Sequence, residues 1–368
     1  MVQAISLFHC KGGKYMKNEI MKTLKDLLSF KTYAENEDEF TKLFNYIKEN
    51  YKELNITEYE FNNKKCLALS NTTSKDVDLL FCTHIDIVYA EDYSITEDDE
   101  NIYGRGTIDM KGSVAVVLTI MKHLQTKAKV TLLITSDEEL TGACAAELSK
   151  IYTSRFVIVP DGGTNFELIV EEKGLIQLEL STKTKAAHAA QLFNGENAIT
   201  KLMDVYQKII EKYPLPKSAD DFITSINLSK LNGGVSNNQV PDYATMVLDI
   251  RNIASDKSED IINFIKSISK DVEVKLITEG PTFSTDLTSE YVKKYIASCE
   301  KVLGTKVIQK GCESTSDAIF FADKNMPTVI MNPNGYYAHS PKEYVNKESL
   351  YTLYKIYEDF IGGNYDKQ

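Results

Sequence analysis

The chain has 368 residues, of which 43% are hydrophobic and 26% are charged, a composition typical of a globular protein of about two domains. Its formal net charge of −11 argues against a nucleic acid or an anionic membrane surface as partner, because both would require a basic face. No apolar run approaches the roughly 18 residues of a membrane span, so we expect no membrane insertion and a small soluble ligand.

The N-terminus and the cysteines indicate a cytoplasmic protein. Residues 1–15 lack the basic segment that precedes the apolar stretch of a signal peptide. Lys11, Gly12 and Gly13 can be encoded by a purine-rich tract that resembles a bacterial ribosome-binding site, so we expect translation to start at Met16. The cysteines are scattered without a CxxC pair, which predicts reduced thiols.

The sequence after residue 16 predicts an α/β domain. Apolar residues at helical spacing predict a pair of helices within residues 18–54. Short runs of continuous hydrophobicity then predict strands that are covered on both faces, as in a mostly parallel sheet sandwiched by helices. These runs are residues 77–82, 130–135, 156–159 and 327–331, and helical patterns lie between them at 113–124, 142–152 and 289–303.

A second, smaller domain is predicted from residue 174 onward. Alternating hydrophobicity predicts strands at 174–182, 223–231, 243–251 and 272–278, with helical patterns at 195–213 and 258–268. The order strand-helix-strand-strand-helix-strand is that of a ferredoxin-like α+β domain. Because α/β character resumes after Pro281, we expect residues 1–173 and 281–368 to form one domain and residues 174–280 to be inserted into it.

Acidic or imidazole residues follow each predicted core strand. The carboxyl ends of parallel strands open onto one edge of the sheet, which is where α/β folds bind their ligands. Residues that are far apart in the sequence should therefore converge there. They are His84 and Asp86 after the first strand, Glu138 and Glu139 after the second, Asp161 after the third and His339 after the last, with Asp109 in the glycine-rich loop GRGTIDMKGS.

This set of side chains predicts a metal site. Imidazole and carboxylate donors without cysteine suit Zn²⁺ above all, with Mn²⁺ or Co²⁺ as alternatives. The donors outnumber the needs of one tetrahedral ion, whereas two ions about 3.5 to 4 Å apart that share one carboxylate use them all. Taken singly, Asp109 could cap a helix and Asp161 could belong to a turn. Their shared position at one sheet edge favours the metal site.

A series of motifs in the sequence follows the order found in one enzyme family. The motifs are THIDIV, YGRGTIDMKGS, SDEELTG, PDGG, AAHAAQLFNGENAI, SNNQVPDYATMVLDIR, STSDAIFFA and YYAHSPKEYV, and they extend from about Met16 to the end of the chain. With them the chain resembles the dinuclear metallohydrolase family that includes acetylornithine deacetylase, succinyl-diaminopimelate desuccinylase, glutamate carboxypeptidase and bacterial di- and tripeptidases.

The resemblance implies a role for each predicted metal ligand. His84, Asp109 and Asp161 correspond to the ligands of one metal ion. Asp109 would also bridge to a second ion, which Glu139 and His339 would hold. The expected cofactor is therefore a pair of divalent ions in each chain, most simply Zn²⁺.

The resemblance also implies roles for residues that bind no metal. Asp86 should hydrogen-bond the far nitrogen of the first histidine and fix its tautomer, and Glu138 is the expected general base and acid. His188 is the expected oxyanion donor, which in this family often comes from the partner subunit of a homodimer formed through the inserted dimerisation or lid domain. Asn238 and Arg251 are expected to bind the substrate's carboxylate, although they could be an ordinary turn former and an exposed strand end.

Departures from the family pattern bear on the substrate. Asp161 stands where deacetylases, desuccinylases and carboxypeptidases of the family usually have Glu, and where its aminopeptidase and dipeptidase members usually have Asp. The compact inserted domain is instead similar to that of desuccinylases and deacetylases. The resemblance implies a dinuclear-metal-dependent hydrolase of amide bonds in small substrates with a free carboxylate. A di- or tripeptidase is slightly favoured over an N-acyl-amino-acid deacylase, and a non-catalytic binding member is a remote alternative.

Overall fold

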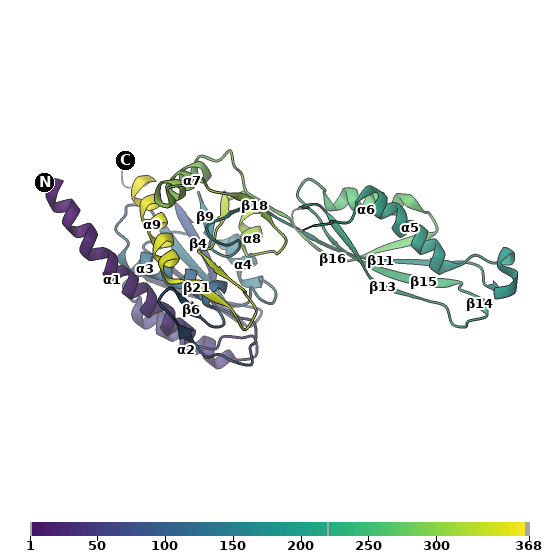
Figure 1. The fold of residues 1–368 in the computed structure, drawn as a ribbon, viewed down its shortest axis with the longest axis horizontal. Helices are drawn as coiled ribbons and strands as arrows, with labels where there is room; N and C mark the ends of the chain where they lie inside the picture. The colour runs from purple at the N-terminus through teal and green to yellow at the C-terminus, as the bar shows by residue number, and fades with distance from the viewer. Residues whose placement is uncertain (1, 219–220, 365–368) are drawn as a thin grey trace. The chain divides into compact units, whose positions relative to one another are not determined.

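The chain divides into two compact units (Figure 1). A computed structural model describes residues 2–218 and 221–364. The first unit comprises the described residues of Met1–Val170, Thr285–Lys310 and Ser316–Gln368, and the second comprises those of Glu171–Ser284 and Gly311–Thr315. Met1 lies outside the described residues, and the expected translation start at Met16 stays a prediction, as does the role of the second unit as a dimerisation or lid domain.

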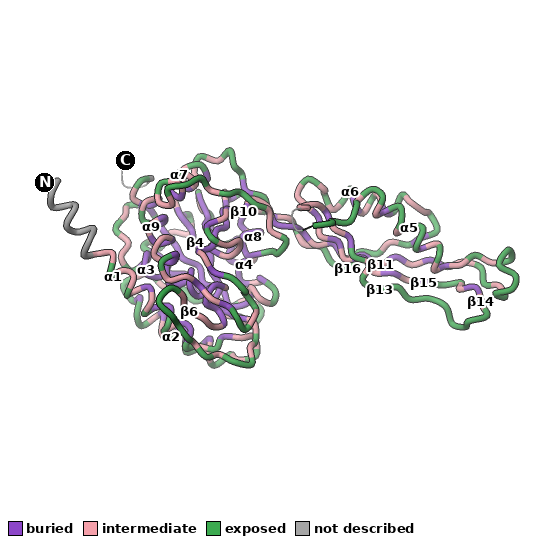
Figure 2. The backbone as a smooth tube through the Cα atoms, in the orientation of Figure 1, coloured by how far each residue is buried: buried purple, intermediate pink, exposed green. Residues whose placement is uncertain are grey.

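The first unit is built on a sheet in which β1, β2, β7, β4, β9, β19 and β10 lie in that order. Its central strands are parallel to one another; they are β7 (Val130–Thr135), β4 (Leu79–His84), β9 (Val157–Val159) and β19 (Thr328–Ile330). Every residue of these strands is buried, as their continuous apolar runs predict (Figure 2). The predicted α/β fold is confirmed, with parallel pairing confined to this centre, since β2 and β10 (Leu168–Glu172) pair with it antiparallel.

Helices cover both faces of this sheet (Figure 1). One layer contains α1 (Val2–Leu28), α3 (Gly112–His123), α7 (Glu290–Leu303) and α9 (Lys347–Asn364), and the other contains α4 (Ala143–Ile151) and α8 (Ala318–Ala322). A further helix, α2 (Glu37–Asn50), follows α1. In the described part of the chain, no helix is both long and apolar enough to cross a membrane.

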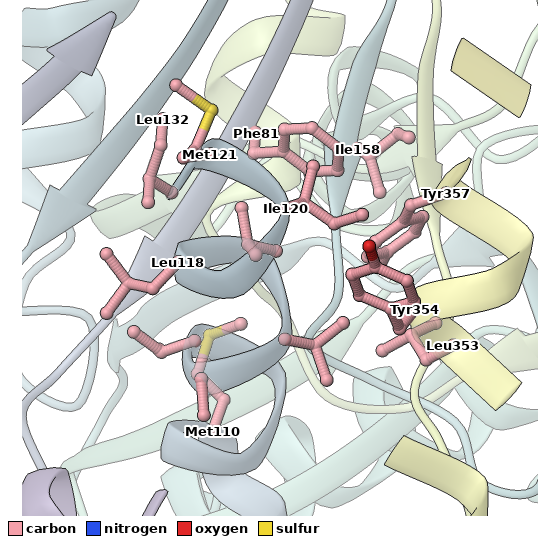
Figure 3. Close-up of a cluster of buried hydrophobic side chains, with 14 of the residues drawn as sticks. Phe81, Met110, Leu118, Ile120, Met121, Leu132, Ile158, Leu353, Tyr354 and Tyr357 are labelled. Carbon is pink, nitrogen blue, oxygen red and sulfur yellow. The ribbon is translucent and has the colours of Figure 1, made fainter. Parts of the chain in front are cut away.

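The main core lies between α3, the sheet and α9 (Figure 3). The apolar sequence of α3 is buried almost throughout, with Leu118 and Met121 among its core side chains. Phe81 of β4 and Tyr357 of α9 meet in a T-shaped ring contact with centroids 5.1 Å apart. A helix that is apolar on every side requires such a fully enclosed position, which explains why α3 lies beneath the sheet's centre.

Several elements that the sequence did not predict lie at edges or are short, whereas β2 and the 18-residue helix α9 were missed although both contribute buried residues to the main core. β1 (Asn55–Phe61) and β2 (Lys64–Ser70) form an antiparallel hairpin that extends the sheet beyond β7. The exposed, charged residues of β1 leave no apolar run to detect. A small sheet of β20 (Gly335–Tyr336), β21 (Tyr344–Asn346), β6 (Asn101–Tyr103) and β5 (Thr96–Glu97) has strands too short for a periodic pattern.

The second unit has the predicted ferredoxin-like topology. Its strands and helices follow the order β11 (Leu175–Lys183), α5 (Ala198–Lys212), β13 (Ser225–Gly233), β15 (Tyr243–Arg251), α6 (Ser258–Ile268) and β16 (Val272–Gly280). The strands form an antiparallel sheet in the order β13-β15-β11-β16. Alternate residues of β15 are buried and pack with residues of α5 and α6. A short ribbon of β12 (Ala187–His188) and β14 (Gln239–Val240) adjoins this sheet.

Candidate active site

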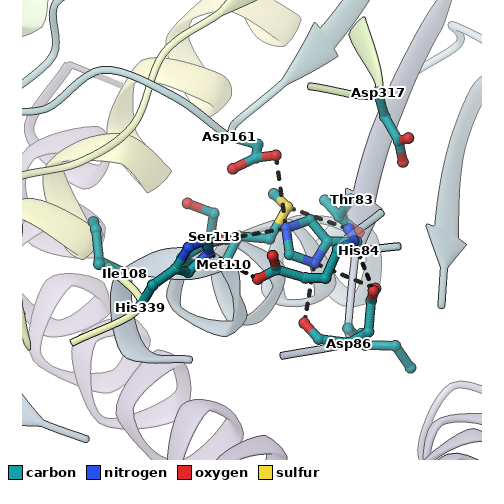
Figure 4. Close-up of polar contacts among 12 residues, drawn as sticks. Thr83, His84, Asp86, Ile108, Met110, Ser113, Asp161, Asp317 and His339 are labelled. Atoms are coloured by element: carbon teal, nitrogen blue, oxygen red, sulfur yellow. Dashed lines mark hydrogen bonds and ion pairs between the residues drawn. The ribbon is translucent and has the colours of Figure 1, made fainter. Parts of the chain in front are cut away.

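The structure gathers the predicted ligands at the carboxyl edge of the central parallel strands (Figure 4). His84 is the last residue of β4, Asp161 follows β9, and Glu138 and Glu139 follow β7. His339 lies in the loop between β20 and β21. These side chains form two donor clusters, in each of which the ligand atoms lie within 4.8 Å of one another. One cluster is His84, Glu138 and Asp161, and the other is Asp109, Glu139 and His339.

Asp109 connects the two clusters. Its Oδ1 lies 3.1 Å from Nε2 of His84, and its Oδ2 lies 2.8 Å from Nε2 of His339. Asp161 Oδ2 approaches Nε2 of His84 to 3.6 Å, and Glu139 Oε1 approaches Nε2 of His339 to 3.1 Å. One carboxylate therefore contacts a histidine of each cluster, which is the geometry that a bridging ligand requires.

Asp86 connects the end of β4 with the loop that follows β7. Nδ1 of His84 lies 3.1 Å from the carbonyl oxygen of Asp86 and 3.4 Å from its Oδ1. The backbone N–H of Glu139 donates to Asp86 Oδ2 at 2.9 Å. Asp86 thus engages the far nitrogen of the His84 ring, leaving Nε2 for the donor clusters, and fixes the loop that carries Glu139.

A buried ion pair that the sequence did not indicate supports the Asp109 loop. Glu343 Oε1 accepts hydrogen bonds from the backbone N–H groups of Ile108 and Asp109 at 3.2 and 3.3 Å. Glu343 Oε2 accepts a hydrogen bond from Arg105 Nη1 at 2.8 Å, and both side chains are buried. Both residues stand in the motifs quoted above, but hydrophobic periodicity carries no signal that pairs residues more than 200 positions apart.

Burial and neighbouring charges shift the proton affinities in the site. Burial raises the pKa of Glu138 to about 10, and the nearby Asp161 carboxylate adds to this effect. Burial likewise raises the pKa of Asp161 to about 7. Hydrogen bonds with Asp109 and Glu139 raise the pKa of His339 to about 10. Packed acids and imidazoles of this kind are stabilised by added positive charge, and their oxygen and nitrogen donors fit Zn²⁺, Mn²⁺ or Co²⁺.

The remaining predicted residues belong to the second unit. His188 is the last residue of β12, and its Nδ1 accepts the N–H of Ala190 at 3.1 Å. Asn238 is close to it in space, because its carbonyl oxygen accepts the N–H of Ala189 at 2.8 Å. Both side chains are exposed, as befits groups that would meet a partner or a substrate.

Arg251 lies away from Asn238. It is the last residue of β15, with its Nε 2.9 Å from Asp249 Oδ1, whereas Asn238 precedes the start of that strand. A strand of nine residues extends about 26 Å from its first to its last residue. The structure therefore does not bring Asn238 and Arg251 together within one chain, so the two cannot bind the same carboxylate unless a second subunit takes part.

Comparison with known proteins agrees with this geometry. Residues 80–362 match the sequence model of peptidase family M20/M25/M40. The LysW-lysine/LysW-ornithine hydrolase of Saccharolobus solfataricus is 27% identical over 350 residues, which cover 93% of this chain and 95% of that protein. A probable succinyl-diaminopimelate desuccinylase of Staphylococcus aureus is 24% identical, with 94% and 97% covered. The crystal structure of aminopeptidase PepT from Bacillus cereus has the same fold, with a TM-score of 0.76, 21% identity, and coverage of 94% of this chain and 98% of that one.

Proposed function

Because the chain belongs to peptidase family M20/M25/M40, whose members are metal-dependent hydrolases of amide bonds, we propose that it cleaves small amides carrying a free carboxylate, with two divalent ions bound. The contact of Asp109 with both His84 and His339 is the observation that carries this proposal. Two such ions would lower the pKa of a shared water and polarise an amide carbonyl. The proposed ligands are His84, Asp109 and Asp161 for one ion and Asp109, Glu139 and His339 for the other, with Zn²⁺ as the native metal.

Glu138 is proposed to move the protons of the reaction. It would take a proton from the attacking water and deliver it to the departing nitrogen. Its burial beside Asp161 supports this role, because both effects raise its pKa and so strengthen it as a base. Bound divalent ions would lower this pKa again, toward the range in which a carboxyl group exchanges protons near neutrality.

His188 is proposed to act from the partner subunit of a homodimer. Its role would be to donate a hydrogen bond to the oxyanion, while Arg251 and the Asn238 of the partner subunit bind the substrate's carboxylate. The separation of Asn238 from Arg251 along β15 supports a shared site. Exposed apolar side chains near His188 also support contact with a second copy, since Phe193 is 86% and Val235 is 87% exposed.

The substrate is proposed to be a short peptide, cleaved as by an exopeptidase. Asp161 supports a peptidase, because the aminopeptidase and dipeptidase members of the family usually have Asp at this position. A second candidate is the removal of an acyl group from an amino acid. It is favoured by the similarity in sequence to the LysW-lysine/LysW-ornithine hydrolase and to the probable desuccinylase.

A substrate panel tests the function. The purified chain is stripped of metal and reloaded with Zn²⁺, Mn²⁺ or Co²⁺, and metal content is measured by mass spectrometry. It is then assayed with dipeptides, tripeptides, N-acetyl and N-succinyl amino acids. We expect the reloaded protein to contain close to two ions per chain. We expect it to hydrolyse one of the substrate classes, and the metal-free protein to hydrolyse none. A fully loaded protein that hydrolyses no member of the panel would contradict the proposal.

A further inference from the structure

A cavity of about 180 Å³ lies beside Glu139 in the first unit, and the roles proposed for Glu139 and Asp86 do not account for its other walls. Its walls include Glu35, Asp86, Val88, Tyr89, Glu139 and Leu140. At about 30 Å³ for each water molecule, this volume holds roughly six waters, or a side chain with a similar number of non-hydrogen atoms. Glu139 belongs to a donor cluster, and the proposed function places the scissile amide of the substrate at the ions that these clusters would hold. A substrate group in this cavity would therefore lie next to that amide.

The charged groups that line the cavity are all acidic: Glu35, Asp86 and Glu139. Asp86 is only 2% exposed, and its Oδ1 lies 3.4 Å from Nδ1 of His84, with no other partner among the residues that the structure describes. Glu35 is exposed and makes no ion pair or hydrogen bond within the described part of the chain. A cavity whose charged groups are all carboxylates carries a negative potential, which favours a cationic ligand.

Lys31 and Lys111, two cations of neighbouring segments, make contacts elsewhere. The Lys31 ammonium lies over the ring of Tyr93, 5.4 Å from its centroid. Lys111 Nζ donates to the carbonyl oxygens of Leu27 and Phe30 at 3.2 and 2.7 Å. Neither ammonium forms an ion pair with Glu35, which is exposed.

The apolar part of the cavity defines the shape of the cationic ligand. Val88 and Leu140 offer aliphatic surface, and Leu140 is 52% exposed although it has no polar atom in its side chain. Tyr89 is 61% exposed and packs edge-on against Tyr33, with ring centroids 5.4 Å apart. A long basic side chain matches such walls, since its methylene stem packs on apolar surface while its charged end reaches a carboxylate or an aromatic ring.

We propose that this cavity is a specificity subsite for an ammonium group of the substrate, and that Glu35 is the residue that recognises it. The inference rests on the proposed function, which puts the reacting amide beside Glu139. The ammonium can belong to a basic side chain or to the free N-terminus of a peptide. The aliphatic walls at Val88 and Leu140 favour the side chain of lysine or ornithine, because an α-ammonium has no stem to cover them.

Kinetics with matched substrates test the subsite. In dipeptides and N-acyl amino acids, lysine is replaced at one position by norleucine, which keeps the methylene stem and lacks the ammonium. We expect kcat/KM to favour the lysine member at least tenfold, and Glu35→Gln to reduce this ratio about tenfold. Asp38→Asn is the matched control, because it removes an exposed acid three residues away that does not line the cavity. A second series with acetylated N-termini distinguishes the sources: loss of the preference on acetylation assigns the subsite to the α-ammonium.

Calorimetry with L-lysine and L-norleucine provides a measurement that does not require turnover. We expect the wild-type chain to bind lysine about tenfold more tightly, with an advantage that shrinks as salt is added and disappears in Glu35→Gln. Equal affinity for the two amino acids, or an unchanged preference in Glu35→Gln, would overturn the subsite. If amides are hydrolysed without a preference for charge, the subsite fails and the proposed function stands. If lysine binds through Glu35 but no amide is cleaved, the proposed function fails and the subsite stands.

Discussion

At the scale of single residues, adjacent carboxylates in the SDEEL loop belong to different donor clusters. Glu138 groups with His84 and Asp161, whereas Glu139 groups with Asp109 and His339. Strand-end position alone predicted that both would lie at the sheet edge, but it could not predict this division, because consecutive residues diverge only through the local backbone of the loop. Glu343 was missed for a related reason: its partners Arg105 and Asp109 are distant in sequence, and pairing between them has no periodic signature.

The different roles proposed for Glu138 and Glu139 can be measured. Glu138→Gln should lower kcat by about 10²- to 10⁴-fold, as expected for loss of a general base, and leave the metal content near that of the wild type. Glu139→Ala should instead release one ion, because it removes a proposed ligand. Steady-state kinetics and mass spectrometry of the metals provide the comparison. Equal metal loss from the two variants would mean that the roles of the neighbours are reversed or shared.

The buried Glu343–Arg105 pair should contribute strongly to stability. Glu343→Ala leaves the Arg105 charge and the N–H groups of Ile108 and Asp109 without their acceptor. We expect the free energy of unfolding to fall by about 3 to 5 kcal/mol in urea denaturation of the metal-free protein. Lys22→Ala is the control, since it breaks an exposed pair with Asp26 at 2.6 Å and should cost only about 0.3 to 0.5 kcal/mol. Similar losses in the two variants would show that the buried pair has no special role.

At the scale of elements, burial helped to predict many strands and helices, but it was not sufficient, because β2 and α9 were missed although both contribute buried residues to the core. β7 and β4 lie at the sheet centre and carry unbroken apolar runs, so their positions followed from the sequence. β1 lies at an edge, where half-exposed charged residues replace such a run. The elements of the second unit were predicted in the correct order, because each has one exposed face and therefore a regular alternation.

The N-terminal cap of α5 tests whether a single local hydrogen-bonding residue stabilises a helix of the second unit. The Asn197 side-chain oxygen accepts the N–H groups of Ile199 and Thr200 at 2.9 and 3.3 Å. Asn197→Ala should destabilise the second unit by about 1 kcal/mol, whereas Asn197→Asp, which keeps an acceptor, should stay close to the wild type. Chemical denaturation followed by far-ultraviolet circular dichroism measures both. An alanine variant as stable as the aspartate variant would show that this cap contributes nothing.

At the scale of the whole molecule, the distance between the substrate-binding candidates could not be predicted from the sequence. Asn238 and Arg251 were expected to share one task, yet they flank the two ends of β15. The order of residues along a strand is visible in a sequence, whereas the partner that completes a site is not. The oligomeric state therefore has to be tested directly.

Mixing two inactive variants provides that test. Glu138→Gln and His188→Ala chains are unfolded together and refolded, so that mixed dimers form. If His188 acts from the partner subunit, one site of each mixed dimer is intact, and a random mixture should recover about a quarter of wild-type activity. Each variant refolded alone is the control. A mixture as inactive as its components would mean that His188 acts within its own chain or that no dimer forms.

The position of Asp109 between His84 and His339 has a consequence for how the site is filled. An ion that draws one oxygen of this carboxylate toward itself alters the charge and the angle that the other oxygen presents. The two positions are thus thermodynamically linked, and the influence must be equal in both directions. The affinity of either position for Zn²⁺ should then depend on whether the other position is occupied, which a titration of both ions would measure.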